Sequence, residues 1–81
     1  MKNQIIFILQ EIRPEFDFTQ SENFLEEGFL DSFDVVRLVS ELDNKFGISI
    51  DGTDILPENF SNIDKIIGLL NKNGVHHESK I

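Results

Sequence analysis

The sequence predicts an all-α fold, a small bundle of three main helices and one short helix. Three segments repeat their apolar residues at spacings of three and four, as an amphipathic helix requires. Residues that break helices follow these segments, at Pro14, Gly47 and Gly74. The stretch Ile48-Ser49-Ile50 alternates like a strand, but it is too short to form a sheet without a visible partner.

The first two predicted helices each end at such a breaking residue. In the first helix the apolar positions fall on one face, at Ile5, Ile6, Leu9 and Ile12. Pro14 then stops it, because a proline disfavours helical angles at the residue before it. The second helix has the strongest pattern, at Val35, Val36, Leu38, Val39, Leu42 and Phe46. Gly47 follows at the C-cap position, while Asp31 is the N-cap candidate and Ser32 the first helical residue.

The third main helix is predicted to end before Gly74. Its apolar positions are Ile63, Ile66, Ile67 and Leu70. At its start, Ser61 and Asp64 form a pattern close to a capping box, with Asp in place of the usual Glu. We therefore expect the helix to begin at this box.

The two connections differ in length. Between residues 51 and 60, Ile55 and Leu56 precede Pro57, which leaves room for one short helical turn. Residues 14–31 form a loop longer than compact domains usually contain. Its apolar side chains are expected to tie it to the core, so that it is ordered: Phe16, Phe18, Phe24 and Leu25.

Length and charge limit the possible functions. The 81 residues suffice for one domain, expected over residues 1–73, with a frayed tail over 74–81. Fifteen acidic against seven basic side chains give a net charge of -8, which disfavours binding to nucleic acids and anionic membranes. Residues 11–58 hold thirteen of these carboxylates, so we expect a strongly negative surface and basic protein partners. No apolar run reaches about 20 residues, and we expect a soluble, cytoplasmic monomer.

Groups suited to catalysis or metal binding are few. The absence of cysteine removes disulfides, thiolate zinc sites and cysteine nucleophiles. The adjacent pair His76-His77 lies in the expected tail, where nothing orients it. Two candidate calcium loops fail: in a loop that starts at Asp43 the sixth position is Ile48 instead of glycine, and in one that starts at Asp51 the fifth position is Ile55, which cannot ligate. We therefore expect neither an enzyme nor a metal site.

The most informative segment is Glu26–Asp34, where an acidic loop with a glycine leads into the second helix. As the first residue of that helix, Ser32 should have an exposed side chain close to free backbone N–H groups. The positive end of the helix dipole favours an anion at this position, so a phosphodiester on the Ser32 hydroxyl would be well accommodated. The alternative is that Asp31 and Ser32 only cap the helix.

The segment Leu30-Asp31-Ser32-Phe33 and the helix after it resemble the acyl and peptidyl carrier proteins. The family motif is Asp-Ser-Leu at the start of helix two, and the likeness extends to a last helix announced by Glu58-Asn59-Phe60. The resemblance implies a four-helix carrier fold whose Ser32 receives 4'-phosphopantetheine from coenzyme A through a phosphopantetheinyl transferase. It also implies a carrier that holds an acyl or aminoacyl group as a thioester, loaded by a ligase and passed to acyl-transfer enzymes.

The resemblance also points to residues that meet the partner enzymes or the cargo. These are Asp31, Phe33, Asp34, Val36, Arg37, Glu41 and Ile55. Two positions depart from the family pattern. Phe33 replaces the usual leucine and is similar to the D-alanyl carrier proteins. Arg37 stands where carriers of fatty acid synthesis usually hold an acidic residue, and its charge would weaken docking of basic synthase enzymes.

Three functions remain open at the level of sequence. The first is a carrier protein primed on Ser32, and its cargo can be a fatty acyl group, an amino acid, D-alanine or a polyketide intermediate. The second is an unmodified acidic helical adaptor that binds a basic partner by charge. The third is a small acidic metal-binding helical protein, which the failed calcium-loop spacings disfavour.

Overall fold

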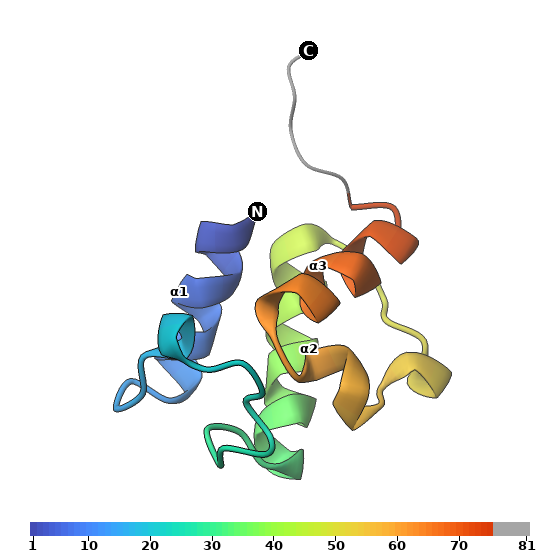
Figure 1. The fold of residues 1–81 in the computed structure, drawn as a ribbon. Coiled ribbons are helices and arrows are strands. Elements are labelled where there is room, and N and C mark those ends of the chain that lie inside the picture. The colour runs from blue at the N-terminus through green and yellow to red at the C-terminus, as the bar shows by residue number, and fades with distance from the viewer. Residues whose placement is uncertain (76–81) are drawn as a thin grey trace.

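The computed structural model describes residues 1–75, and the regular elements of this part of the chain are all helical (Figure 1). The body of the fold is formed by α1 (Lys2–Ile12), α2 (Ser32–Phe46) and α3 (Ile63–Lys72). Single turns of 3-10 helix occur in the connections, at η1 (Phe18–Gln20), η2 (Gly52–Asp54) and η3 (Pro57–Phe60). The all-α class and the three main helices predicted from the sequence are confirmed.

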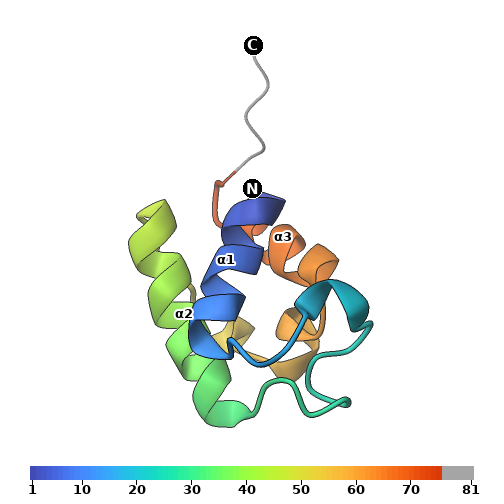
Figure 2. The ribbon, with the colours of Figure 1, turned by 90° about the vertical axis from the view of Figure 1, so that its left-hand side faces the viewer.

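The helices surround one core. α1 and α2 lie side by side and run in opposite directions, so the end of α1 lies near the beginning of α2 (Figures 1 and 2). α3 packs against α1, and the η3 turn packs against both α3 and α2. The most deeply buried side chains are Phe18, Phe24, Phe60, Ile5, Leu9, Leu38, Leu42, Ile66 and Leu70. Each α-helix thus turns its apolar face inward, as the spacing of three and four residues predicts.

α2 begins and ends at the predicted residues. The side chain of Asp31 caps its first turn, and Gly47 follows its last residue with a φ of 65°, a left-handed conformation that suits glycine. Ser32 is therefore the first residue of the helix. Val36, which belongs to the apolar pattern of α2, is 64% exposed, unlike its neighbour Val35, which is buried.

α3 begins one residue later than predicted. Asn62, not Ser61, is the N-cap, and its side-chain oxygen accepts a hydrogen bond from the backbone N–H of Lys65 at 2.8 Å. The buried hydroxyl of Ser61 donates to the carbonyl oxygen of Glu58 instead. Asn and Ser cap helices about equally well, so two neighbouring candidates could not be separated by residue type alone.

The short helix predicted between α2 and α3 is present as two separate turns, η2 and η3. Leu56 is extended between them, because the following Pro57 disfavours helical angles at that position. Pro57 itself suits the first residue of η3, where no backbone N–H is needed. The interruption leaves Ile55 and Leu56 in the short connection between the two turns.

The long loop between α1 and α2 is tied to the core by its phenylalanines, as expected. Phe18 and Phe24 are buried and pack edge to face, with ring centroids 5.0 Å apart, and Phe16 stacks on Phe29 at 4.5 Å. The backbone N–H of Phe24 also donates to the carbonyl oxygen of Ser61 at 2.7 Å. These contacts fix the path along which the loop enters α2.

The described chain reaches into the tail predicted over residues 74–81. Gly74 has a φ of 89°, and the N–H of Val75 donates to the carbonyl oxygen of Leu70 at 2.9 Å, so these two residues close α3. The rest of that tail, including His76 and His77, lies outside the described residues. Across residues 1–75, none of the helices has the length and apolar character needed to span a membrane.

Alanine substitutions should separate the buried face of α2 from the exposed one. Leu38 has no exposed surface, so Leu38→Ala leaves a cavity and should lower the free energy of unfolding by about 2–5 kcal/mol. Val36→Ala, on the exposed flank of the same helix, should change it by less than about 0.5 kcal/mol. Urea titration followed by circular dichroism measures both values. Equal losses in the two variants would contradict this assignment of faces.

Candidate functional site

Ser32 lies at the start of α2 between the two members of a capping box. The backbone N–H of Asp34 donates to Asp31 Oδ1 at 2.9 Å, and the N–H of Asp31 donates to Asp34 Oδ2 at 3.1 Å. The side chain of Ser32 is exposed, and its hydroxyl has no hydrogen-bond partner within residues 1–75. Asp31 therefore supplies the side-chain cap, and the Ser32 hydroxyl is left accessible for chemistry.

Arg13, which no sequence pattern indicated as part of the site, joins the end of α1 to the start of α2. Its Nε donates to Asp34 Oδ2 at 2.8 Å, and one terminal nitrogen donates to Asp31 Oδ2 at 3.3 Å. The side chain of Asp34 is only 14% exposed, whereas that of Asp31 is 57% exposed. The guanidinium thus contacts both carboxylates next to Ser32 and offsets part of their negative charge. No local spacing reveals this contact, because Arg13 and Asp34 are 21 residues apart.

The same network keeps Asp31 ionised. The pKa of its carboxyl lies below the ordinary value, chiefly because the backbone N–H of Asp34 donates to it. The positive charge of Arg13 lowers this pKa further, while partial loss of water acts in the opposite direction. A carboxylate with a lowered pKa is a weak base, so Asp31 is poorly suited to take a proton from Ser32.

An apolar groove of about 240 Å³ opens beside Ser32. It is lined by Leu25, Ser32, Val35, Val36, Ile55 and Pro57. These side chains come from α2, from the loop before it and from the segment around η3. Ile55, which the resemblance names among the residues that meet a partner or the cargo, lines the same groove as Ser32. Leu25, Val35 and Pro57 were not predicted as part of the site, because only the folded chain brings them together.

The exposed face of α2 forms a crest next to Ser32, made of Phe33, Val36, Arg37, Ser40 and Glu41. Phe33 is 84% exposed, which is unusual for a phenylalanine, and Val36 is 64% exposed. Most of the residues predicted to contact partners therefore lie on one accessible surface. The other three lie elsewhere: Asp31 is exposed before Ser32, Ile55 lines the groove, and the carboxylate of Asp34 is mostly buried against Arg13.

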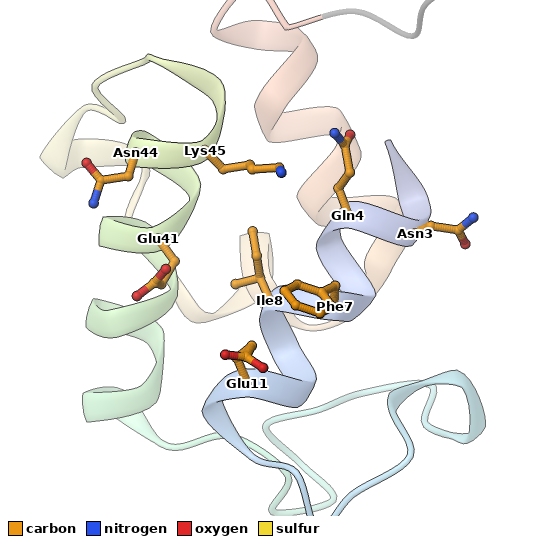
Figure 3. A pocket seen from close by; sticks show the side chains of 8 residues that line it. All are labelled: Asn3, Gln4, Phe7, Ile8, Glu11, Glu41, Asn44 and Lys45. Atoms are coloured by element: carbon orange, nitrogen blue, oxygen red, sulfur yellow. The ribbon is translucent and has the colours of Figure 1, made fainter.

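A second groove, of about 450 Å³, lies between α1 and α2 at some distance from Ser32 (Figure 3). Phe7 and Ile8 of α1 lie at its centre, and Glu41 and Lys45 project from α2 on its other side. Glu41 follows Ser32 by nine residues, about 13 Å along the helix axis. This groove is separate from the Ser32 site, and no sequence pattern led us to expect it.

Asp43 and Asp51, which begin the two rejected calcium loops, accept hydrogen bonds from nearby backbone N–H groups. Asp51 Oδ1 accepts hydrogen bonds from the N–H and the hydroxyl of Thr53, both at 2.9 Å. Asp43 accepts from the N–H of Ile50 at 3.0 Å. Within the described part of the chain, no group of three or more His, Cys, Asp or Glu side chains is placed to hold a metal ion.

Removing the carboxylate of Asp31 should destabilise the protein in a pH-dependent way. A carboxyl whose pKa is lowered by folding stabilises the native state above its unfolded pKa of about 3.9, and this contribution is lost as the pH falls through the folded value. Asp31→Ala should therefore have a lower Tm than the parent at pH 7. This difference in Tm should become smaller below about pH 4.

Asp31→Asn is the matched control for this prediction, because it keeps an oxygen that can accept from the Asp34 N–H but removes the charge. Its Tm at neutral pH should lie between those of the parent and Asp31→Ala. Thermal unfolding followed by circular dichroism at several pH values measures all three proteins. A difference in Tm between the parent and Asp31→Ala that stays constant over this pH range would show that the charge of Asp31 does not contribute to the cap.

The residues at Ser32 fit a phosphopantetheine group. Its phosphodiester requires an accessible hydroxyl, which Ser32 provides at the positive end of α2, and its arm can contact the groove of Val36 and Ile55. The model of the family described as phosphopantetheine attachment site matches residues 4–70, which contain Ser32 and nearly all of the three α-helices. A search among curated proteins gave no match. The chain therefore belongs to the phosphopantetheine-attachment family of acyl and peptidyl carrier proteins, and its cofactor is 4'-phosphopantetheine.

Proposed function

We propose that Ser32 is the residue that carries the phosphopantetheine group. The observation that supports this is its exposed, unpartnered hydroxyl at the first residue of α2, beside an apolar groove. Two other serines of the described chain are exposed, but Ser40 lies in the middle of α2 and Ser49 in the connection after it. Among residues 1–75, Ser32 is thus the serine that combines accessibility, a helix N-terminus and an adjacent groove.

The attachment step uses the oxygen of Ser32 as the nucleophile. Its Oγ forms a bond to the phosphorus that carries the pantetheine in coenzyme A, and 3',5'-adenosine bisphosphate leaves with the electron pair of the broken bond. The proton of the hydroxyl passes to a base of the transferase, because the lowered pKa of Asp31 makes its carboxylate a weak acceptor. The chain therefore supplies position and accessibility, and the transferase supplies the catalysis.

The surroundings of Ser32 suit a negatively charged ester. The N-terminus of α2 favours the phosphodiester through its dipole, and Arg13 reduces the repulsion that the carboxylates of Asp31 and Asp34 exert on it. When bound, the group supplies a thiol on a long flexible arm, which holds an acyl or aminoacyl group as a thioester and raises its concentration at partner active sites. The chain itself acts as a carrier and performs no step of the chemistry on this cargo.

Three classes of partner follow from this function: the transferase, a ligase that loads an acyl or aminoacyl group, and downstream acyl-transfer enzymes of a biosynthetic pathway. Because coenzyme A is the donor, we place the protein in the cytoplasm. The alternative within the family is a D-alanyl or peptidyl carrier that is loaded by a dedicated adenylating ligase. Phe33 beside Ser32 favours this alternative. An unmodified acidic adaptor would leave the accessible hydroxyl of Ser32 without a role.

Incubation with coenzyme A and a broad-specificity phosphopantetheinyl transferase should add one phosphopantetheine to the parent chain and none to Ser32→Ala. Ser40→Ala is the matched control, because it removes another exposed serine from the same helix and should be modified like the parent. Intact-mass spectrometry measures the addition, and circular dichroism checks that each variant is folded. A folded parent that gains no mass, with this transferase and with a second one, would favour the adaptor.

Attachment should also change the groove beside Ser32 and leave the groove of Phe7 unchanged. We expect differences in amide chemical shift between the unmodified and the modified protein to cluster at Leu25, Val36 and Ile55, whose side chains line the first groove. The amides of Phe7 and Lys45, at the second groove, are an internal control in the same nitrogen–proton NMR spectra. Shifts that spare Ile55, or that spread evenly over the chain, would contradict a contact between the arm and this groove.

A further inference from the structure

Charges of both signs lie next to Ser32, although the chain as a whole is strongly acidic. The two carboxylates of the first turn, Asp31 and Asp34, are both paired with Arg13. The next charged side chain along α2 is Arg37, which is exposed and makes no ion pair within residues 1–75. A protein that approaches Ser32 over α2 therefore meets an acidic pair whose charge Arg13 offsets only in part, and then an exposed positive charge that makes no ion pair within residues 1–75.

Arg37 is close enough to act on such a protein. It follows Ser32 by five residues, about 7 Å along the helix axis, which is within the Debye length of about 8 Å at physiological salt. The crest around it is otherwise apolar near Ser32, because Phe33 is 84% and Val36 is 64% exposed. Contact with this part of the crest removes apolar surface from water and leaves Arg37 in need of an opposite charge.

We propose that Arg37 determines which enzymes dock on the crest: the partner presents an apolar surface to Phe33 and Val36 and a carboxylate opposite Arg37. An enzyme whose docking surface is basic at that point is disfavoured by like-charge repulsion. The proposal rests on the proposed function in one respect, since it places the partner at Ser32. It also means that the groups close to Ser32 decide which partner docks, whereas the net charge of -8 by itself would predict basic partners.

Docking can be measured without modification of the carrier. In a Ser32→Ala background, the Kd for a phosphopantetheinyl transferase whose docking surface is basic is determined by isothermal titration calorimetry, at low salt and at high salt. Two carriers are compared, one with Arg37 and one with Arg37→Glu. Both carriers are then titrated with a transferase variant in which Glu replaces the basic residue that faces the crest. The four Kd values complete a double-mutant cycle.

Lys45→Glu is the matched control for charge. It makes the same charge reversal on an exposed position of α2, but thirteen residues beyond Ser32, about 20 Å along the axis and outside the screening distance. Any effect of net charge alone would therefore appear in both carrier variants. An effect of local contact would appear in Arg37→Glu alone.

Arg37→Glu should tighten binding to the basic transferase roughly tenfold at low salt, with a smaller effect at high salt. It should weaken binding to the transferase variant, while Lys45→Glu changes either Kd by less than about twofold. The proposal is overturned if Arg37→Glu behaves like Lys45→Glu, if the two substitutions of the cycle are additive, or if neither carrier binds either transferase. Failure of the parent to gain mass would instead count against Ser32 as the attachment residue, because docking is measured without that hydroxyl.

Discussion

The ion pair between Arg13 and Asp34 is the contact on which the geometry of the site depends. The antiparallel packing of α1 and α2 places the end of one helix beside the start of the other, and the guanidinium joins them at that point. Asp34 also accepts the backbone N–H of Asp31, so one carboxylate belongs both to the ion pair and to the capping box. The first turn of α2, with Ser32, is therefore held by a tertiary contact as well as by local capping.

Charge acts at two distances in this protein. The net charge of -8 sets the field that an approaching molecule meets first, but salt screens that field beyond about 8 Å. At contact, the individual groups decide: Arg13 offsets part of the charge of Asp31 and Asp34, and Arg37 and Phe33 remain on the surface. Two carriers with the same net charge can therefore select different enzymes.

Local sequence signals were sufficient for α2, because its apolar period and both of its caps lie within residues 31–47. The start of α3 was predicted one residue early, since Ser61 and Asn62 are both good capping residues and only the contact of Ser61 with Glu58 decides between them. Ser32 was predicted as the attachment residue from its place after Asp31 together with the family motif. Arg13 and most of the groove were missed, because those contacts join segments far apart in the chain.

The groove beside Ser32 can form only after residues far beyond Ser32 have been synthesised. Its lining extends from Leu25 to Pro57, and the loop on one side is fastened by the bond from the Phe24 N–H to the carbonyl of Ser61. Contacts over such separations form only after the intervening chain has closed on itself. During translation Ser32 leaves the ribosome before Ser61 does, so a nascent chain exposes the serine without its groove. An enzyme that reads the shape of the groove thereby distinguishes a finished domain from an unfinished one.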